Sequence, residues 1–137
     1  MKDEESTNSL EQSIKMHEGL VLHVYLDVVG VPTIGFGRNL NMGISEEEAL
    51  FMLRNDLKIC THEAEKYWFY NQLSPARKEV IVEMIYNLGA HKLRQFKKML
   101  YAIEQGDFKE ASYQMLESKW SSQVGKRAIT LSKKMFE

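Results

Sequence analysis

The chain has 137 residues, a formal net charge of −1 and 27% charged residues, which predicts one globular domain and excludes a disordered chain. Its single cysteine makes an intramolecular disulfide impossible. No apolar stretch approaches the ~20 residues of a membrane span. The polar, acidic start MKDEESTNSL cannot form the apolar core of a signal peptide.

Charge is divided unevenly along the chain. Residues 1–70 hold six Lys or Arg and twelve Asp or Glu, a balance of −6, whereas residues 71–137 hold twelve and seven, a balance of +5. A basic half can attract an anionic polymer, either nucleic acid or acidic cell wall. The simpler interpretation is a set of charges scattered over solvated helix faces.

The predicted elements begin with a polar tail over residues 1–8 and a helix over 9–18. Ser9 and Gln12 form a capping-box pattern at the start of this helix, and Gly19 ends it.

A small antiparallel sheet is predicted next. Apolar and polar residues alternate from Leu22 to Asp27, and the run VPTIGF becomes extended again after a turn at residues 28–30. Pro32 restricts the second run to an edge strand or a strand start. A short third strand is expected near residues 39–42.

Helical signals return at Ser45 and continue to the C-terminus. Ser45 and Glu48 form a capping box that opens a helix over about 45–68, and Cys60 falls on its apolar stripe. Further starts or stops are predicted by sequence punctuation, at Ser74-Pro75, Gly89, Gly106, Asp107 with Glu110, and Val124.

The elements together predict an α+β fold, mostly helical, with one small sheet lobe. In this prediction a single catalytic domain covers residues 9–137. A sheet lobe (about 19–44) is joined by a long helix (about 45–68) to a helical lobe made of residues 74–137 and the helix 9–18. A cleft between lobes is a usual place for a binding site.

Two carboxylates flank the predicted first strand. Glu18 ends a helix, Asp27 ends the strand, and Thr33 lies in the returning strand. Glycoside hydrolysis needs two carboxyl groups in different environments, one protonated as acid and one ionised as base or nucleophile. The alternative is that Glu18 is a solvated helix-end residue and Asp27 a turn residue.

Residues 18–40 resemble the active-site segment of the phage lysozyme family. The family pattern is matched by Glu18-Gly19-Leu20, by Asp27, and by Thr-Ile-Gly-x-Gly at residues 33–37. Downstream, MIYNLG at 84–89, Phe96, Ser118-Lys119-Trp120, Gln123 and Arg127-Ala128 also fit. The resemblance covers roughly residues 9–136 and implies a lysozyme-like fold and activity.

The resemblance also implies site residues. Glu18 would be the general acid, Asp27 the base or nucleophile and Thr33 the residue that positions water, with inversion at the sugar. Tyr86, Gln114 and Arg127 would contact substrate. Partial burial would raise the pKa of Glu18. Arg127 aligns with the family arginine that pairs with this glutamate, and such a cation would lower the same pKa.

Several positions depart from the family pattern. Leu40 to Ser45 is short, which predicts a smaller sheet lobe. Arg38 stands where the family has a histidine in a structural ion pair, so that pair is either absent or rebuilt. Asn39 and Met99 stand where the family has a leucine and a serine that contact substrate. Because their chemistry differs, the resemblance gives little support for these two residues as substrate contacts.

Weaker signals receive structural interpretations. His62-Glu63 begins like a zinc-protease helix, but Lys66 stands where the second histidine is required, so no metal site is expected. Trp68 and Trp120 are predicted in the core, as is Phe96 within the basic cluster Lys92, Arg94, Lys97 and Lys98.

The sequence therefore predicts a cofactor-free, monomeric muramidase that cleaves peptidoglycan for host lysis. It would lie in the host cytoplasm until a holin-type pore lets it reach the periplasm and cell wall. Three alternatives stay open: a catalytically silent wall-binding module of the same fold, a lytic transglycosylase, and a nucleic-acid-binding domain. The intact acidic pair argues against the first two, and an anionic wall suits the basic half better than nucleic acid.

Overall fold

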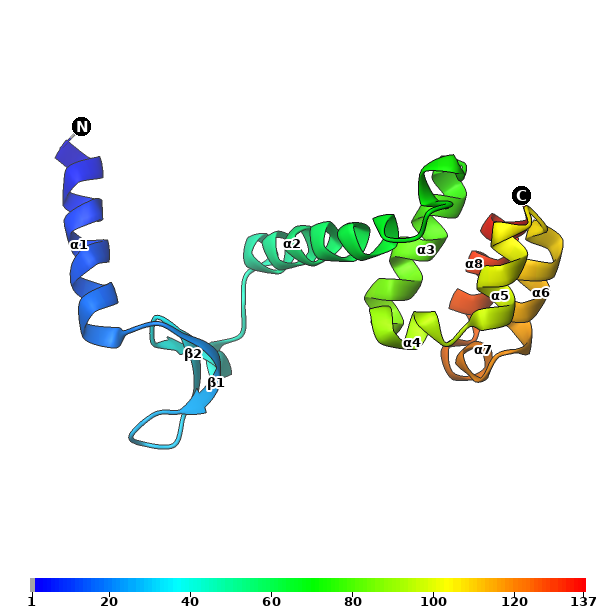
Figure 1. The fold of residues 1–137 in the computed structure, drawn as a ribbon. Helices are drawn as coiled ribbons and strands as arrows, with labels where there is room; N and C mark the ends of the chain where they lie inside the picture. The colour runs from blue at the N-terminus through cyan, green and yellow to red at the C-terminus, as the bar shows by residue number, and fades with distance from the viewer. Residues whose placement is uncertain (1) are drawn as a thin grey trace. The chain divides into compact units, whose positions relative to one another are not determined.

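A computed structural model describes the backbone of residues 2–137 and the side chains of residues 7–137. By its internal contacts the chain divides into two compact units, Met1–Leu50 and Phe51–Glu137, called here the N-terminal unit and the helical unit. The architecture is α+β, as predicted, with one three-stranded antiparallel sheet and otherwise helices (Figure 1).

The N-terminal unit contains the sheet, with strand order β1-β2-β3. Its elements are α1 (Lys2–Glu18), β1 (Val21–Leu26), β2 (Pro32–Gly35), β3 (Arg38–Asn39) and the 3-10 helix η1 (Leu40–Met42). Both strand pairs are antiparallel, so the predicted hairpin is confirmed. The third strand begins one residue earlier than expected, and η1 occupies the rest of the predicted range.

The predicted start of the first helix is wrong. α1 begins at Lys2, so Ser9 lies inside the helix and cannot be its N-cap, and the predicted polar tail is helical from Lys2. Neither Gly nor Pro interrupts residues 2–18, so no sequence signal stops the helix from extending in the N-terminal direction. The contacts of α1 assign it to the N-terminal unit. Its predicted grouping with the helical lobe stays a prediction.

Arg38 and Glu48 form a bidentate ion pair between β3 and the start of α2 (Glu46–Glu65). Arg38 Nη1 donates to Glu48 Oε2 at 2.7 Å and Nη2 donates to Oε1 at 3.1 Å. Glu48 Oε1 also accepts from Ser45 N at 3.0 Å, and Ser45 Oγ accepts from Glu48 N at 3.1 Å, which confirms the predicted capping box. An ion pair is therefore present at the position where the family histidine forms one.

This pair predicts an acid-sensitive contribution to stability. The hydrogen bonds from Arg38 and Ser45 lower the pKa of Glu48 from 4.5 to about 2. A carboxylate with a lowered pKa stabilises the fold above its unfolded pKa and loses that contribution as pH falls from about 4.5 toward 2. We expect Arg38→Gln to flatten this part of the curve of thermal midpoint against pH, with the midpoint lowered at pH 7 and approaching that of the wild type near pH 2. Parallel curves for the two proteins between pH 5 and pH 2 would contradict this role.

The helical unit holds the C-terminal part of α2 and all later helices. These are η2 (Tyr70–Gln72), α3 (Pro75–Leu88), α4 (Ala90–Arg94), α5 (Lys97–Glu104), α6 (Phe108–Glu117), α7 (Lys119–Val124) and α8 (Lys126–Phe136). α6 packs against both α5 and α8, and α3 packs against α4 and α8 (Figure 1). The predicted starts at Ser74 and Asp107 are confirmed, because each side chain accepts a hydrogen bond from the backbone N–H three residues later.

The core of this unit is built from one face of each helix. Its fully buried large side chains are Val80, Ile81, Met84, Leu93, Met99, Met115, Leu131 and Met135. Cys60 and Trp120 are buried as predicted, and Trp120 Nε1 donates to Asn87 Oδ1 at 2.7 Å. Phe96 packs edge-to-face on Trp120 with ring centroids 6.2 Å apart, which confirms it as a core anchor.

Two predictions in this unit need correction. Trp68 is 63% exposed, because α2 ends at Glu65 and the following loop turns the indole outward, where Nε1 donates to Glu104 Oε1 at 3.4 Å. The last helix starts at Lys126, after Gly125 adopts a φ of +59°, and the separate short helix α7 precedes it.

Candidate active site

Glu18 is the last residue of α1, and its side chain lies against the backbone of Gly37. The helix ends here because Gly19 adopts a φ of +71°, and its N–H donates to the Lys15 carbonyl at 2.9 Å. A Cβ placed on Gly37 would lie 2.8 Å from Glu18 Cδ and 3.2 Å from Cγ. Glu18 is otherwise exposed. Within this unit, the predicted partial burial is limited to the side of the carboxyl group that faces Gly37.

Asp27 follows β1 directly and organises the hairpin loop. Its Oδ1 accepts hydrogen bonds from Val29 N at 2.9 Å and from Val31 N at 2.8 Å. The interpretation of Asp27 as a turn residue is therefore correct as far as it goes. Among residues 7–137, the hydrogen bonds given to this carboxylate all use Oδ1. Oδ2 takes part in neither of these bonds.

Thr33 lies in β2, the central strand, and is 4% exposed. Its hydroxyl donates to the Val31 carbonyl at 2.8 Å. Because that bond uses the only hydroxyl proton, the oxygen is left to accept a hydrogen bond from another donor, such as water. In the strand register Thr33 is paired with Tyr25 on one side and with Asn39 on the other.

Val31 connects Asp27 and Thr33 through its peptide groups. Its N–H donates to the Asp27 carboxylate, and its carbonyl accepts both from Asp27 N, at 3.0 Å, and from the Thr33 hydroxyl. Both side chains are thus hydrogen-bonded to the backbone of the same residue, which ties their positions to one another.

Glu18 and Asp27 stand at the two ends of β1 in the same unit. Glu18 lies three residues before the strand begins, and Asp27 is the residue after it ends. The register of β1 against β2 is irregular between Val21 and Tyr25, so the strand is bent locally between the two carboxylates. The chemistry this pair can perform is acid–base catalysis by two carboxyl groups in different surroundings.

The residues predicted to contact substrate lie in the helical unit, at two separate cavities. Tyr86 and Arg127 line the same cavity of about 590 Å³. Arg127 Nε donates to Glu83 Oε2 at 2.8 Å, across helices α8 and α3. The pairing of Arg127 with Glu18 that the resemblance implies stays a prediction, because the two residues belong to different units.

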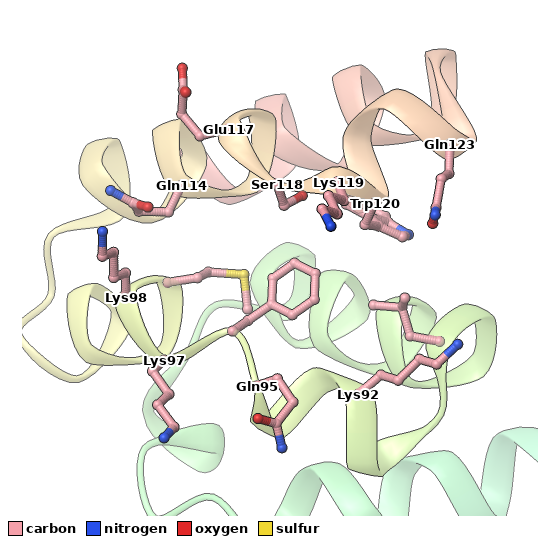
Figure 2. A pocket seen from close by; sticks show the side chains of 13 residues that line it. Lys92, Gln95, Lys97, Lys98, Gln114, Glu117, Ser118, Lys119, Trp120 and Gln123 are labelled. Atoms are coloured by element: carbon pink, nitrogen blue, oxygen red, sulfur yellow. The ribbon is translucent and has the colours of Figure 1, made fainter.

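Gln114 lines the second, larger cavity, of about 670 Å³. Its floor is formed by the apolar side chains of Leu88, Phe96, Met99 and Trp120. Its rim carries four lysines and three glutamines, namely Lys92, Lys97, Lys98, Lys119, Gln95, Gln114 and Gln123, beside Glu117 and Ser118 (Figure 2). Met99, which had little support as a substrate contact, lines the same cavity as Gln114. An apolar floor with a cationic rim suits a ligand that carries both apolar parts and negative charge.

Sequence reasoning found only part of this cavity. Of the four residues in the predicted basic cluster, three line it, whereas Arg94 approaches Glu63, with Nη1 at 4.0 Å from Oε2. The side chains of Trp120 and Gln123 reach it from α7 (Figure 2). Trp120 and Gln123 lie far from the basic cluster in the sequence, so no sequence pattern indicated that they line the same cavity as that cluster.

Within residues 2–137, no helix has both the length and the apolar composition needed to cross a membrane. Among the side chains of residues 7–137, no group of three or more His, Cys, Asp or Glu gathers in a way that could hold a metal ion.

The fold and the candidate site indicate the class of protein. It is an α+β protein of the lysozyme-like type, with a glutamate and an aspartate at the ends of one strand of a small sheet. The chain belongs to the phage lysozyme family, whose model matches residues 15–135.

Individual relatives extend this comparison. The chain is 26% identical over 152 aligned positions to "Probable T4-type lysozyme 2" of Dictyostelium discoideum, covering 88% of this chain and 89% of the relative. It is 28% identical over 154 positions to "Probable T4-type lysozyme 1" of the same organism, with the same coverage. It is also 24% identical to the "Pre-baseplate central spike protein Gp5" of Enterobacteria phage T4, over 92% of this chain and 27% of that protein. Each alignment is longer than this chain, so the relatives carry segments that it lacks.

Proposed function

We propose that this protein is a muramidase that hydrolyses the β-1,4 bond between N-acetylmuramic acid and N-acetylglucosamine in peptidoglycan, in the service of host-cell lysis. The observation that carries this proposal is the pair Glu18 and Asp27 at the two ends of β1, with Thr33 tied to Asp27 through Val31. Membership of the phage lysozyme family supports it.

In the proposed mechanism Glu18 gives its proton to the leaving glycosidic oxygen. Asp27, acting through its free Oδ2, removes a proton from a water molecule on the opposite face of the sugar. The Thr33 oxygen accepts a hydrogen bond from the second O–H of that water, since its own proton is donated to the Val31 carbonyl. Attack from the opposite face produces inversion at the anomeric carbon.

Analysis of the reaction products tests this proposal. Purified peptidoglycan digested by the protein should yield fragments with a free reducing end, initially of the inverted anomer. A 1,6-anhydro product would instead identify a lytic transglycosylase, which needs no water. Binding without any product would identify the alternative, a catalytically silent wall-binding module. Mass spectrometry separates the first two outcomes, and early-time NMR reports the anomer.

The larger cavity of the helical unit is proposed to bind the anionic part of the wall. We expect lysis of whole walls to fall steeply with salt, whereas cleavage of a short neutral oligosaccharide should not, because salt screens long-range attraction to a polymer. An equal salt response on both substrates would count against this cavity as a docking surface.

Single lysines locate this effect. Lys92→Gln and Lys119→Gln should each weaken wall binding at low salt by about two- to fivefold, the scale of one exposed ionic contact. Lys109→Gln is the matched control, since it removes the same charge from α6 at a position outside the cavities described.

We further propose that the protein acts as a monomer and reaches the wall from the host cytoplasm through a holin-type pore made by another protein. Nucleic acid is not proposed as a partner, because apolar side chains line the basic cavity and an anionic wall suits such a lining better than a phosphate backbone does.

A further inference from the structure

Eight glycines of this chain adopt positive φ, but the space around them differs. A Cβ added to seven of them would meet nothing within 4 Å. At Gly37 it would meet the Glu18 side chain, with Cδ at 2.8 Å and Cγ at 3.2 Å, and Oε2 closer still. Real Cβ atoms do not approach other atoms this closely, so any side chain at residue 37 requires the Glu18 carboxyl group to move.

A second contact places α1 against the same segment. Lys15 lies one helical turn before Glu18, and its Nζ lies over the Phe36 ring, 5.7 Å from the centroid. Two residues of one helix face therefore contact two consecutive residues, Phe36 and Gly37. The end of α1 is held over the loop between β2 and β3 at the place where the side chain of residue 37 is missing.

We propose that Gly37 is a positioning residue for the general acid: its missing side chain leaves the space that the Glu18 carboxyl group occupies, and the Lys15–Phe36 contact keeps the helix end over that space. This inference rests on the proposed function only for the consequence that activity depends on it. It also separates the two glycines of the Thr-Ile-Gly-x-Gly segment. Gly35 serves only the backbone conformation, whereas Gly37 serves both conformation and space.

Gly35 provides a matched control for Gly37. Their φ values are +72° and +74°, so alanine at either position is forced into a similar left-handed φ. Only Gly37→Ala also introduces a contact with Glu18. We expect Gly37→Ala to lower the lysis rate about 10–100-fold, the effect of misplacing a catalytic group by about 1 Å, and Gly35→Ala to have a much smaller effect.

The pH profile distinguishes displacement of the acid from partial unfolding. The alkaline limb of the activity profile reports loss of the proton from the general acid. Gly37→Ala should shift this limb, because the carboxyl group moves into new surroundings. A smaller folded fraction would scale the whole profile without shifting the limb. Gly35→Ala should leave the limb in place.

A double-mutant cycle on thermal stability tests the contact without using activity. Glu18→Ala removes every Glu18 atom that the new Cβ would meet, so the loss of thermal midpoint caused by Gly37→Ala should shrink to that caused by Gly35→Ala. Glu18→Ala should not change the loss caused by Gly35→Ala.

The outcomes separate the two claims. Additive losses in the cycle, or a Gly37→Ala protein that fails to fold even with Glu18→Ala while Gly35→Ala folds, would overturn the positioning role. Strong coupling in stability with unchanged lysis by Gly37→Ala would keep the contact but remove its catalytic meaning. Full activity of Glu18→Gln would overturn the proposed function instead and leave the structural contact intact.

Discussion

Replacing Glu18 with glutamine is expected to lower the rate of wall lysis by at least about 100-fold, within the 10²–10⁴-fold contribution typical of a general acid. The amide has nearly the shape of the carboxyl group, so it can occupy the same space beside Gly37, but it cannot deliver a proton to the leaving oxygen. Lysis of purified walls and binding to the same walls should both be measured, because binding is expected to stay nearly unchanged.

Glu11→Gln is the matched control for this prediction. Glu11 is also exposed on α1, two helical turns before Glu18, and its replacement makes the same change in charge. The thermal midpoints of both variants should equal that of the wild type, or rise for Glu18→Gln, since catalytic carboxylates are often placed at the expense of stability. If Glu18→Gln keeps more than about a tenth of the activity, Glu18 is not the proton donor.

Local signals predicted the helix starts well because capping involves residues only three apart. Ser45 with Glu48, Ser74, and Asp107 each form the backbone hydrogen bond that their spacing predicts. The same signal misled at Ser9, where a capping pattern lies inside α1. A serine can cap the start of a helix only where the residues before it are not helical. The residues before Ser9 are helical from Lys2 onward.

Features that depend on distant residues could not be predicted in this way. Arg127 contacts Glu83, 44 residues earlier in the chain, and no spacing rule links the two. The outward position of Trp68 follows from where α2 ends, and apolar periodicity extends through Tyr67 without marking that end. The larger cavity is lined by residues from every helix from α3 to α7, and only the packed core brings these helices together.

The candidate site stays a prediction as a set of residues, and the structure adds how those residues are held. The motif spacing indicated Glu18, Asp27 and Thr33. The role of Val31, which links Asp27 to Thr33 through its own N–H and carbonyl, leaves no mark in the sequence because any residue except proline could supply both groups. The different environments of Gly35 and Gly37 are likewise invisible in a motif that writes both as glycine.

We propose that Asp27 both organises the hairpin loop and acts as the base, and two substitutions separate these roles. Asp27→Asn keeps an Oδ1 that can accept hydrogen bonds from Val29 N and Val31 N, so the hairpin loop should persist. It removes the negative charge, so the residue can no longer take a proton from water. We expect Asp27→Asn to lower lysis by at least about 100-fold with little change in the thermal midpoint.

Asp27→Ala should lose activity to the same extent and should also lose stability. It removes both side-chain hydrogen bonds to the loop, each contributing about 0.5–1.5 kcal/mol, so we expect destabilisation of about 1–3 kcal/mol and a thermal midpoint lower by several degrees. Lysis assays and thermal denaturation of the wild type and both variants test the two tasks together. If Asp27→Asn stays active while Asp27→Ala is only less stable, Asp27 is a turn residue, and the base must be another group. Inactivity of both variants with a stability loss in alanine alone would assign the chemistry to the charge and the hairpin to the acceptor oxygen.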